Sequence, residues 1–215
     1  MFINLDDITL FYEKTGFGDP LVLLHGNGED HQIFAHAIEE LSQVYTVYAV
    51  DSRNHGQSTM TNEFHYETMA LDIEQMIEKL NLNHVTLVGF SDGGILCLII
   101  ASKQPSWLKK IIAMGANLYP SGVKPNVNFD TRKDYERTGN PYLKMMLEEP
   151  MITNKMLHKI NVPTLVVAGS DDVIMKGHTK KIANHIKDSE LIILDGETHE
   201  SYVVRGHHLV DIILK

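Results

Sequence analysis

The sequence predicts an α/β fold built on one mostly parallel, twisted sheet of about eight strands with helices on both faces. Short apolar runs alternate along the chain with amphipathic stretches of about 10 to 15 residues, which is typical of strands joined by crossover helices. Some runs, such as 21–24, are apolar at successive positions, as expected of strands buried on both faces. A chain of 215 residues can bury one large core, so we expect a single domain over 1–215.

Eight strand-like runs account for this sheet. The runs 2–5 and 8–14 are separated by Asp6-Asp7, which predicts an opening hairpin. The other strands are expected at 21–24, 44–50, 85–90, 108–114, 162–168 and 190–194. Helices are expected at about 31–43, 66–80, 95–104, 176–187 and 202–214.

The segment 117–160 interrupts the alternation of strands and helices. It contains several prolines and two short helical pieces, and it is too long for a simple strand-to-helix loop. We therefore expect a cap inserted over the carboxyl ends of the strands, where such sheets bind ligands. The cap is rich in methionine, at Met145, Met146, Met151 and Met156, and these side chains either line a flexible apolar pocket or pack against the core.

Composition excludes several classes of protein. The net charge of −9 argues against nucleic-acid binding, which needs a concentrated basic surface. The single cysteine, Cys97, lies in the apolar run 95–101 and is expected to be a core side chain rather than a reactive thiol. No apolar run approaches the roughly 20 residues that a membrane span needs, and residues 1–7 do not read as a signal peptide. The expected location is cytoplasmic, without membrane association.

The apolar run 85–90 leads into Gly89-Phe90-Ser91-Asp92-Gly93, and a helical pattern follows. A strand that turns sharply into a helix needs glycine where the backbone bends or where neighbouring elements come close. Such a turn holds one hydroxyl above the edge of the sheet in a strained conformation. Ser91 is therefore the candidate nucleophile.

A serine hydroxyl needs a base within hydrogen-bond reach, and the base needs a carboxylate to orient it. His199 follows the strand 190–194 on a loop, at the same edge of the sheet as Ser91. Asp171 and Asp172 come just after another strand, at that edge again. Both aspartates also suit a turn that caps the next helix, but the order Ser, Asp, His along the chain favours a catalytic triad.

Five short motifs appear in a fixed order, each weak by itself. They are His25-Gly26, Asp51-x-Arg53-x-His55-Gly56-x-Ser58, Gly89-x-Ser91-x-Gly93, Gly169-x-x-Asp172 and His199. Over nearly its full length the chain resembles the α/β-hydrolase superfamily. One departure is Asn54, which stands where that superfamily usually has the glycine of Arg-Gly-His-Gly.

The resemblance implies particular roles for residues at the site. It places the acid three residues after the glycine that ends its strand, which favours Asp172 over Asp171. It also implies an oxyanion hole made by two backbone N–H groups, those of Asp92 and Asn27, with Gly28 as the second choice for the latter. The carboxylate of Asp92 is sufficiently explained by its position at a helix N-terminus.

The resemblance implies structural roles for His25 and His55, as hydrogen-bonding residues behind the oxyanion loop. It also implies acyl-transfer chemistry, because relatives that open epoxides or remove halogens carry aspartate at the position of Ser91.

The expected function is hydrolysis of small or medium carboxylic esters through an acyl-enzyme, with a small-molecule substrate and neither cofactor nor metal. Two alternatives remain open. One is another reaction on the same triad, namely that of a small-substrate peptidase, C–C hydrolase, perhydrolase or lyase. The other is a ligand receptor or signalling protein that carries a triad.

Overall fold

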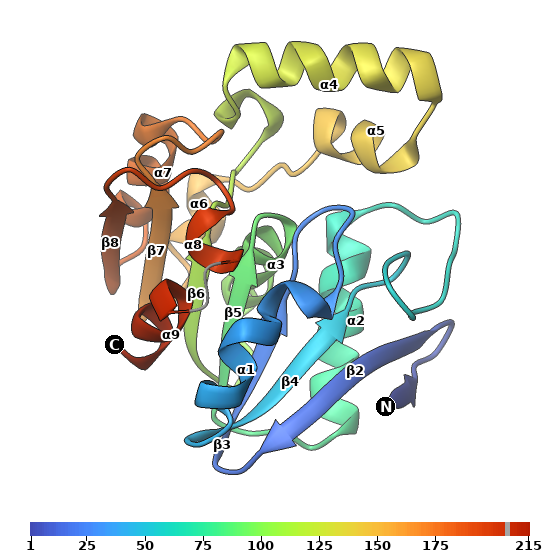
Figure 1. Cartoon of the computed structure of the whole chain (residues 1–215), viewed down its shortest axis with the longest axis vertical. Helices are drawn as coiled ribbons and strands as arrows, with labels where there is room; N and C mark the ends of the chain where they lie inside the picture. The colour runs from blue at the N-terminus through green and yellow to red at the C-terminus, as the bar shows by residue number, and fades with distance from the viewer. Residues whose placement is uncertain (205–206) are drawn as a thin grey trace.

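An eight-stranded sheet forms the centre of the computed structural model, which describes residues 1–204 and 207–215 (Figure 1). The strand order is β1-β2-β4-β3-β5-β6-β7-β8, with β1 and β2 antiparallel to their neighbours and the strands from β4 to β8 parallel. The strands are β1 (Phe2–Asn4), β2 (Thr9–Gly16), β3 (Asp19–Leu24), β4 (Tyr45–Asp51), β5 (Val85–Phe90), β6 (Leu108–Met114), β7 (Thr164–Gly169) and β8 (Ser189–Leu194). The mostly parallel sheet that the sequence predicts is confirmed.

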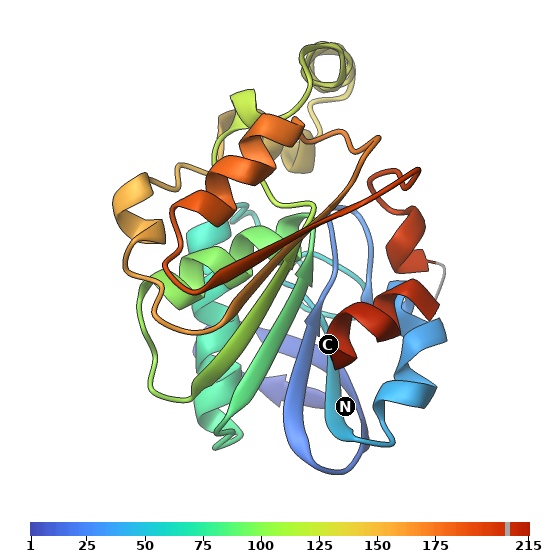
Figure 2. The same cartoon turned by 90° about the vertical axis from the view of Figure 1, so that its left-hand side faces the viewer.

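Helices cover both faces of this sheet (Figure 2). One face carries α2 (Tyr66–Lys79), α3 (Asp92–Ser102) and α7 (Lys176–Asn184), and the other carries α1 (Ala35–Leu41), α8 (Ser201–Val204) and α9 (His207–Leu214). A separate apolar core fills each side. Every residue of α3 is buried, which explains why its sequence is apolar all round rather than amphipathic.

Two of the predicted helices differ in detail. The helix expected from residue 31 begins as a 3₁₀ turn, η1 (His31–Phe34), and continues as α1. The closing helix expected over 202–214 is present as α8 and α9, and residues 205–206 of that prediction lie outside the described residues. None of the helices over 1–204 and 207–215 is long and apolar enough to cross a membrane.

The segment 117–160 is called the cap segment below; most of it lies above the carboxyl ends of the strands, and its last part packs beside α3 (Figure 1). It holds η2 (Pro120–Gly122), α4 (Pro125–Thr138), α5 (Pro141–Glu148) and α6 (Asn154–Leu157). The expectation of two short helical pieces was wrong, because α4 alone has 14 residues. No side chain of α4 is completely buried, so its sequence has no apolar stripe that would predict a helix. The only signals in the sequence are at its two ends, Pro125 in the first turn and Gly139 in the left-handed conformation after the last.

Candidate active site

The turn between β5 and α3 holds Ser91 in a strained backbone conformation, with φ of 53° and ψ of −112°. Both neighbouring glycines are needed for packing. A Cβ at Gly89 would lie 2.0 Å from the carbonyl oxygen of Gly93, and a Cβ at Gly93 would lie 2.1 Å from that of Leu24. The Ser91 N–H donates to Met114 O at 2.8 Å, so the turn is also tied to the neighbouring strand.

The structure brings Ser91, His199 and Asp172 into one hydrogen-bonded row. His199 Nε2 lies 3.1 Å from Ser91 Oγ, and His199 Nδ1 lies 2.7 Å from Asp172 Oδ1. The three residues follow β5, β7 and β8, whose carboxyl ends share one edge of the sheet. This geometry lets Nε2 take the proton of Ser91 while Nδ1–H donates to the carboxylate.

The structure also separates the two candidate aspartates. Asp172 is buried, and its Oδ1 accepts a second hydrogen bond from the N–H of Ile174 at 2.8 Å. Asp171 is exposed, and its backbone N–H donates to Glu197 O at 3.0 Å. Asp172 is therefore the carboxylate that contacts His199, and it is the one that the resemblance favours.

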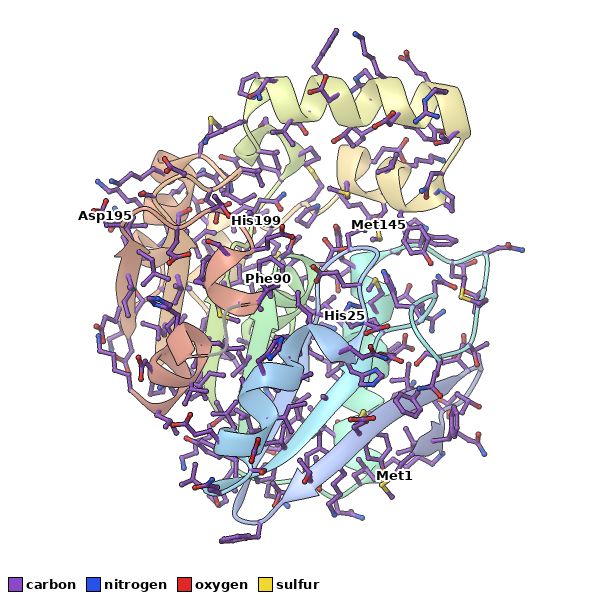
Figure 3. The ribbon with its side chains drawn as sticks, viewed as in Figure 1. Met1, His25, Phe90, Met145, Asp195 and His199 are labelled. Atoms are coloured by element: carbon purple, nitrogen blue, oxygen red, sulfur yellow. The ribbon has the colours of Figure 1, made fainter. Side chains whose placement is uncertain are left out.

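His199 is oriented by packing as well as by hydrogen bonds. Its ring lies beside Phe90, with ring centroids 4.9 Å apart, under the cap segment (Figure 3). Gly115, which follows β6 with φ of 60°, passes close behind the ring, and a Cβ there would lie 2.8 Å from His199 Cε1. Substitution of Gly115 would therefore displace His199.

The loop Gly26–Glu29 faces Ser91, and some of its backbone N–H groups donate hydrogen bonds within the protein while others do not. The N–H of Gly26 donates to Glu29 Oε2 at 2.8 Å, and the N–H of Gly28 donates to His55 Nε2 at 3.0 Å. Within residues 1–204 and 207–215, no hydrogen-bond acceptor lies against the backbone N–H of Asn27 or of Asp92. The two donors that the resemblance implies are thus the free ones, whereas that of Gly28 is engaged.

A pair of buried histidines supports this loop from behind. His25 Nδ1 donates to Gly26 O at 2.7 Å, and His25 Nε2 accepts from the N–H of Ser52 at 3.1 Å. Burial, with nearby His55 adding to it, lowers the pKa of His25 to about 4, so its ring stays neutral. His55 Nε2 accepts from Gly28, which leaves His55 Nδ1–H to donate to Arg53 O at 2.9 Å. Both histidines hold backbone groups and do not face Ser91.

A cavity of about 460 Å³, including its open mouth, lies between the core and the cap segment above Ser91. Its lining is Tyr66, Ser91, Asp92, Asn117, Val123, Val127, Asn128, Thr131, Met146, Glu149, Val173, Ile174 and His199. Of the cap methionines only Met146 belongs to this lining, while Met145 is buried beneath α5 (Figure 3) and Met151 is exposed. Met145 and Met156 therefore pack against the core, and Met146 alone of the four lies in the cavity lining.

Three acidic or phenolic groups at the site were missed from the sequence: Glu29, Tyr66 and Glu149. The Asp92 carboxylate is buried and accepts from Tyr66 Oη–H at 2.7 Å and from Asn27 Nδ2 at 2.9 Å. Burial raises the pKa of Asp92, and burial also raises the pKa of Glu29 to about 7. No sequence signal marked Glu29, because Gly26 is not a helix N-cap and the following turn of helix is capped by Asp30. Tyr66 looks like an ordinary core aromatic.

A possible metal-binding group occurs elsewhere among the described residues, at Asp30, His31 and Asp51. Asp51 Oδ1 accepts from the N–H and from Nδ1 of His31, at 2.8 and 2.7 Å, and Asp51 Oδ2 accepts from the N–H of Gln57 at 2.8 Å. These bonds occupy both oxygens of the Asp51 carboxylate with protein donors. The group therefore braces the loop after β4 instead of offering free ligands.

Comparison with known proteins gives a consistent picture. Residues 19–150 match the model of the family described as alpha/beta hydrolase fold. Serine hydrolase BPHL of Homo sapiens is 28% identical over 94% of this chain and 80% of its own length. AB hydrolase superfamily protein YisY of Bacillus subtilis is 28% identical over 92% of this chain and 91% of its own length. The solved esterase EaEST of Exiguobacterium antarcticum shares the fold, with a TM-score of 0.87, 22% identity and coverage of 99% of this chain and 97% of that chain.

Proposed function

The chain belongs to the alpha/beta hydrolase fold family, and from this premise we propose that it is a serine carboxylesterase for small or medium esters. The observation that carries the proposal is the row of hydrogen bonds from Ser91 through His199 to Asp172, with distances of 3.1 and 2.7 Å. Ser91 would be the nucleophile, His199 the general base and Asp172 the acid that orients His199. The cap segment would act as the lid of a single catalytic domain.

The mechanism follows from these positions. Ser91 Oγ attacks the ester carbonyl carbon while His199 Nε2 takes the hydroxyl proton, and the imidazolium is stabilised by Asp172. The carbonyl oxygen gains negative charge and accepts hydrogen bonds from the N–H groups of Asn27 and Asp92. His199 then protonates the leaving alcohol, and a water activated by the same ring hydrolyses the acyl-enzyme. The route needs no cofactor.

The cavity supports a limit on the substrate. The cavity is narrow and lies between the core and the cap segment, which supports a small or medium ester rather than a polymer. Its lining contains the carboxyl groups of Asp92 and Glu149 and includes neither lysine nor arginine among the described residues. We therefore expect substrates without a negative charge close to the scissile bond.

The test combines an active-site label with turnover. A fluorophosphonate should label Ser91, and short-chain aryl esters should turn over repeatedly, with both properties lost in Ser91→Ala. Asp172→Asn should lower kcat by at least about 10³-fold, because the imidazolium and its tautomer lose their partner. The matched control Asp171→Asn, at an exposed position, should change kcat by less than about twofold.

Two results would contradict the esterase. If Ser91 is neither labelled nor needed for ester turnover, the triad does not act as proposed. A single turnover followed by a persistent adduct, without release of the acyl group, would point instead to a ligand receptor that carries a triad.

A further inference from the structure

We propose that the cap segment positions the oxyanion donor Asn27 through two separate chains of contacts that begin at Tyr142 and Glu149. This inference rests on the proposed function, because it assigns positioning residues to the same acyl-transfer site. Tyr142 belongs to α5, and Glu149 is the residue that caps its C-terminal end. One chain ends at the backbone of Gly28, which follows Asn27, and the other ends at the Asn27 side chain.

The first chain runs from Tyr142 through His55 to Gly28. Tyr142 Oη–H donates to Asn54 O, and the Tyr142 ring lies edge-on against His55 with ring centroids 4.9 Å apart. His55 in turn accepts the N–H of Gly28 at 3.0 Å. The α5 tyrosine therefore fixes both the backbone before His55 and the ring itself, and His55 holds the residue that follows Asn27.

The second chain runs from Glu149 through Tyr66 and Asp92 to the Asn27 side chain. Glu149 Oε2 accepts the N–H of Tyr66 at 3.1 Å, and Glu149 Oε1 lies 2.5 Å from His65 Nδ1. Tyr66 Oη–H donates to Asp92 Oδ1 at 2.7 Å, and Asp92 Oδ2 accepts from Asn27 Nδ2 at 2.9 Å. Glu149 thereby fixes the start of α2, and through it the side chain of Asn27.

Both chains of contacts end next to the backbone N–H of Asn27, whose direction decides how well it can donate to an oxyanion. The N–H of Asn27 has no acceptor among the described residues, so its direction depends on how its own side chain and the following residue are held. His55, Tyr66 and Asp92 are each at most 5% exposed, so water does not compete for the hydrogen bonds that they make. An oxyanion donor misplaced by about 1 Å costs up to roughly 10²-fold in rate. The cap would thus complete the oxyanion hole as well as cover the substrate.

The test removes one hydroxyl from each chain and keeps the rings. Tyr142→Phe and Tyr66→Phe should each lower kcat for a neutral aryl ester by roughly 10-fold, with KM changed less than about threefold. The double variant should lose less than the product of the two single effects, because both act on Asn27. The inhibition constant of a trifluoromethyl ketone, whose adduct carries an oxyanion, should rise by the same factor as kcat/KM falls. Tyr119→Phe, a cap tyrosine whose hydroxyl contacts Lys181, should match wild type.

Glu149 gives an independent check that does not depend on either phenylalanine variant folding well. Glu149→Ala should behave like Tyr66→Phe, whereas Glu149→Gln keeps an acceptor for the N–H of Tyr66 and should recover most of the kcat that the alanine variant loses. Two results would refute the positioning role while leaving the esterase intact, provided that wild type is labelled and turns over. In the first, Tyr142→Phe, Tyr66→Phe and Glu149→Ala all keep the wild-type kcat. In the second, the double variant loses kcat by the full product of the two single losses. If Ser91 is not labelled in wild type, the esterase and this inference fall together.

Discussion

At the scale of single residues, Glu29 has an unusual environment in the loop Gly26–Glu29. Its carboxylate accepts the N–H of Gly26, yet burial outweighs that bond and raises its pKa to about 7 from the usual 4.5. Between those two pH values the folded protein keeps a proton that the unfolded chain releases. The contribution of Glu29 to stability therefore falls as pH rises from about 4.5 to about 7 and is constant above.

Replacing Glu29 by glutamine tests this linkage. Glu29→Gln keeps an oxygen acceptor for Gly26 but cannot ionise, so its stability relative to wild type should increase between about pH 4.5 and pH 7. The measurement is urea unfolding of both proteins across that range. Glu63→Gln, at an exposed position, serves as control and should run parallel to wild type. Parallel curves for Glu29→Gln as well would show that Glu29 titrates normally.

At the scale of elements, the packing of α3 against the sheet depends on Gly93. A Cβ at this position would lie 2.1 Å from Leu24 O on β3, and backbone cannot yield as a flexible side chain can. Gly93→Ala should therefore push α3 away from β3 and lower the free energy of unfolding by at least about 1 to 3 kcal/mol. Chemical denaturation measures the loss, and ester turnover should fall with it because Ser91 lies at the start of α3.

Gly177 in α7 provides the matched control. Nothing lies within 4 Å of a Cβ built there, and the residue is helical without a positive φ. Gly177→Ala should leave activity unchanged and raise the free energy of unfolding by up to about 1 kcal/mol, since alanine restricts the unfolded chain and favours helix. Equal losses in the two variants would mean that the close approach of α3 to β3 is not what Gly93 provides.

At the scale of the whole molecule, a buried ion pair joins the loop after β4 to α2. Arg53 donates to Asp72 through Nε at 2.5 Å and through Nη2 at 2.6 Å, and both side chains are at most 4% exposed. Asp72→Ala should lower the free energy of unfolding by about 3 to 5 kcal/mol, because it leaves a buried charge unpaired. The double variant Arg53→Met/Asp72→Leu should recover much of that loss in thermal or chemical unfolding. If the double variant stays as unstable as Asp72→Ala, the main stabilising partner of Arg53 is the exposed Asp7 and not Asp72.

Charge acts over the whole molecule as well. The net charge of −9 and the carboxyl groups of the cavity both disfavour anions near Ser91. An aryl butyrate should therefore exceed the matching succinate half-ester in kcat/KM by at least about 5-fold, because two like charges about 4 Å apart repel by about 1 kcal/mol even at the dielectric constant of water. Added salt should reduce the ratio of the two kcat/KM values, and Glu149→Gln should reduce it further. Equal rates at low salt would contradict an acidic cavity.

The sequence by itself predicted the features that depend on neighbours along the chain. Apolar runs predicted the sheet and helical periodicity predicted α2, because burial of one face of a helix imposes a period on the sequence. The glycine spacing predicted the turn at Ser91. Because parallel strands end at one edge, the order of Ser91, Asp172 and His199 along the chain also predicted that the structure would bring these side chains together.

Only the tertiary structure decided what depends on contacts through space. The polar helix α4 buries no side chain completely, so no apolar periodicity in the sequence predicted its length. The direction of the free N–H of Asn27 depends on two distant residues: His55 accepts from Gly28, 27 residues earlier in the chain, and Asp92 accepts from the Asn27 side chain, 65 residues earlier. Tyr66 and Glu149 look like a core aromatic and a surface acid until α5 is placed above the sheet. Such roles arise from close packing between distant segments, which a linear pattern of polarity does not record.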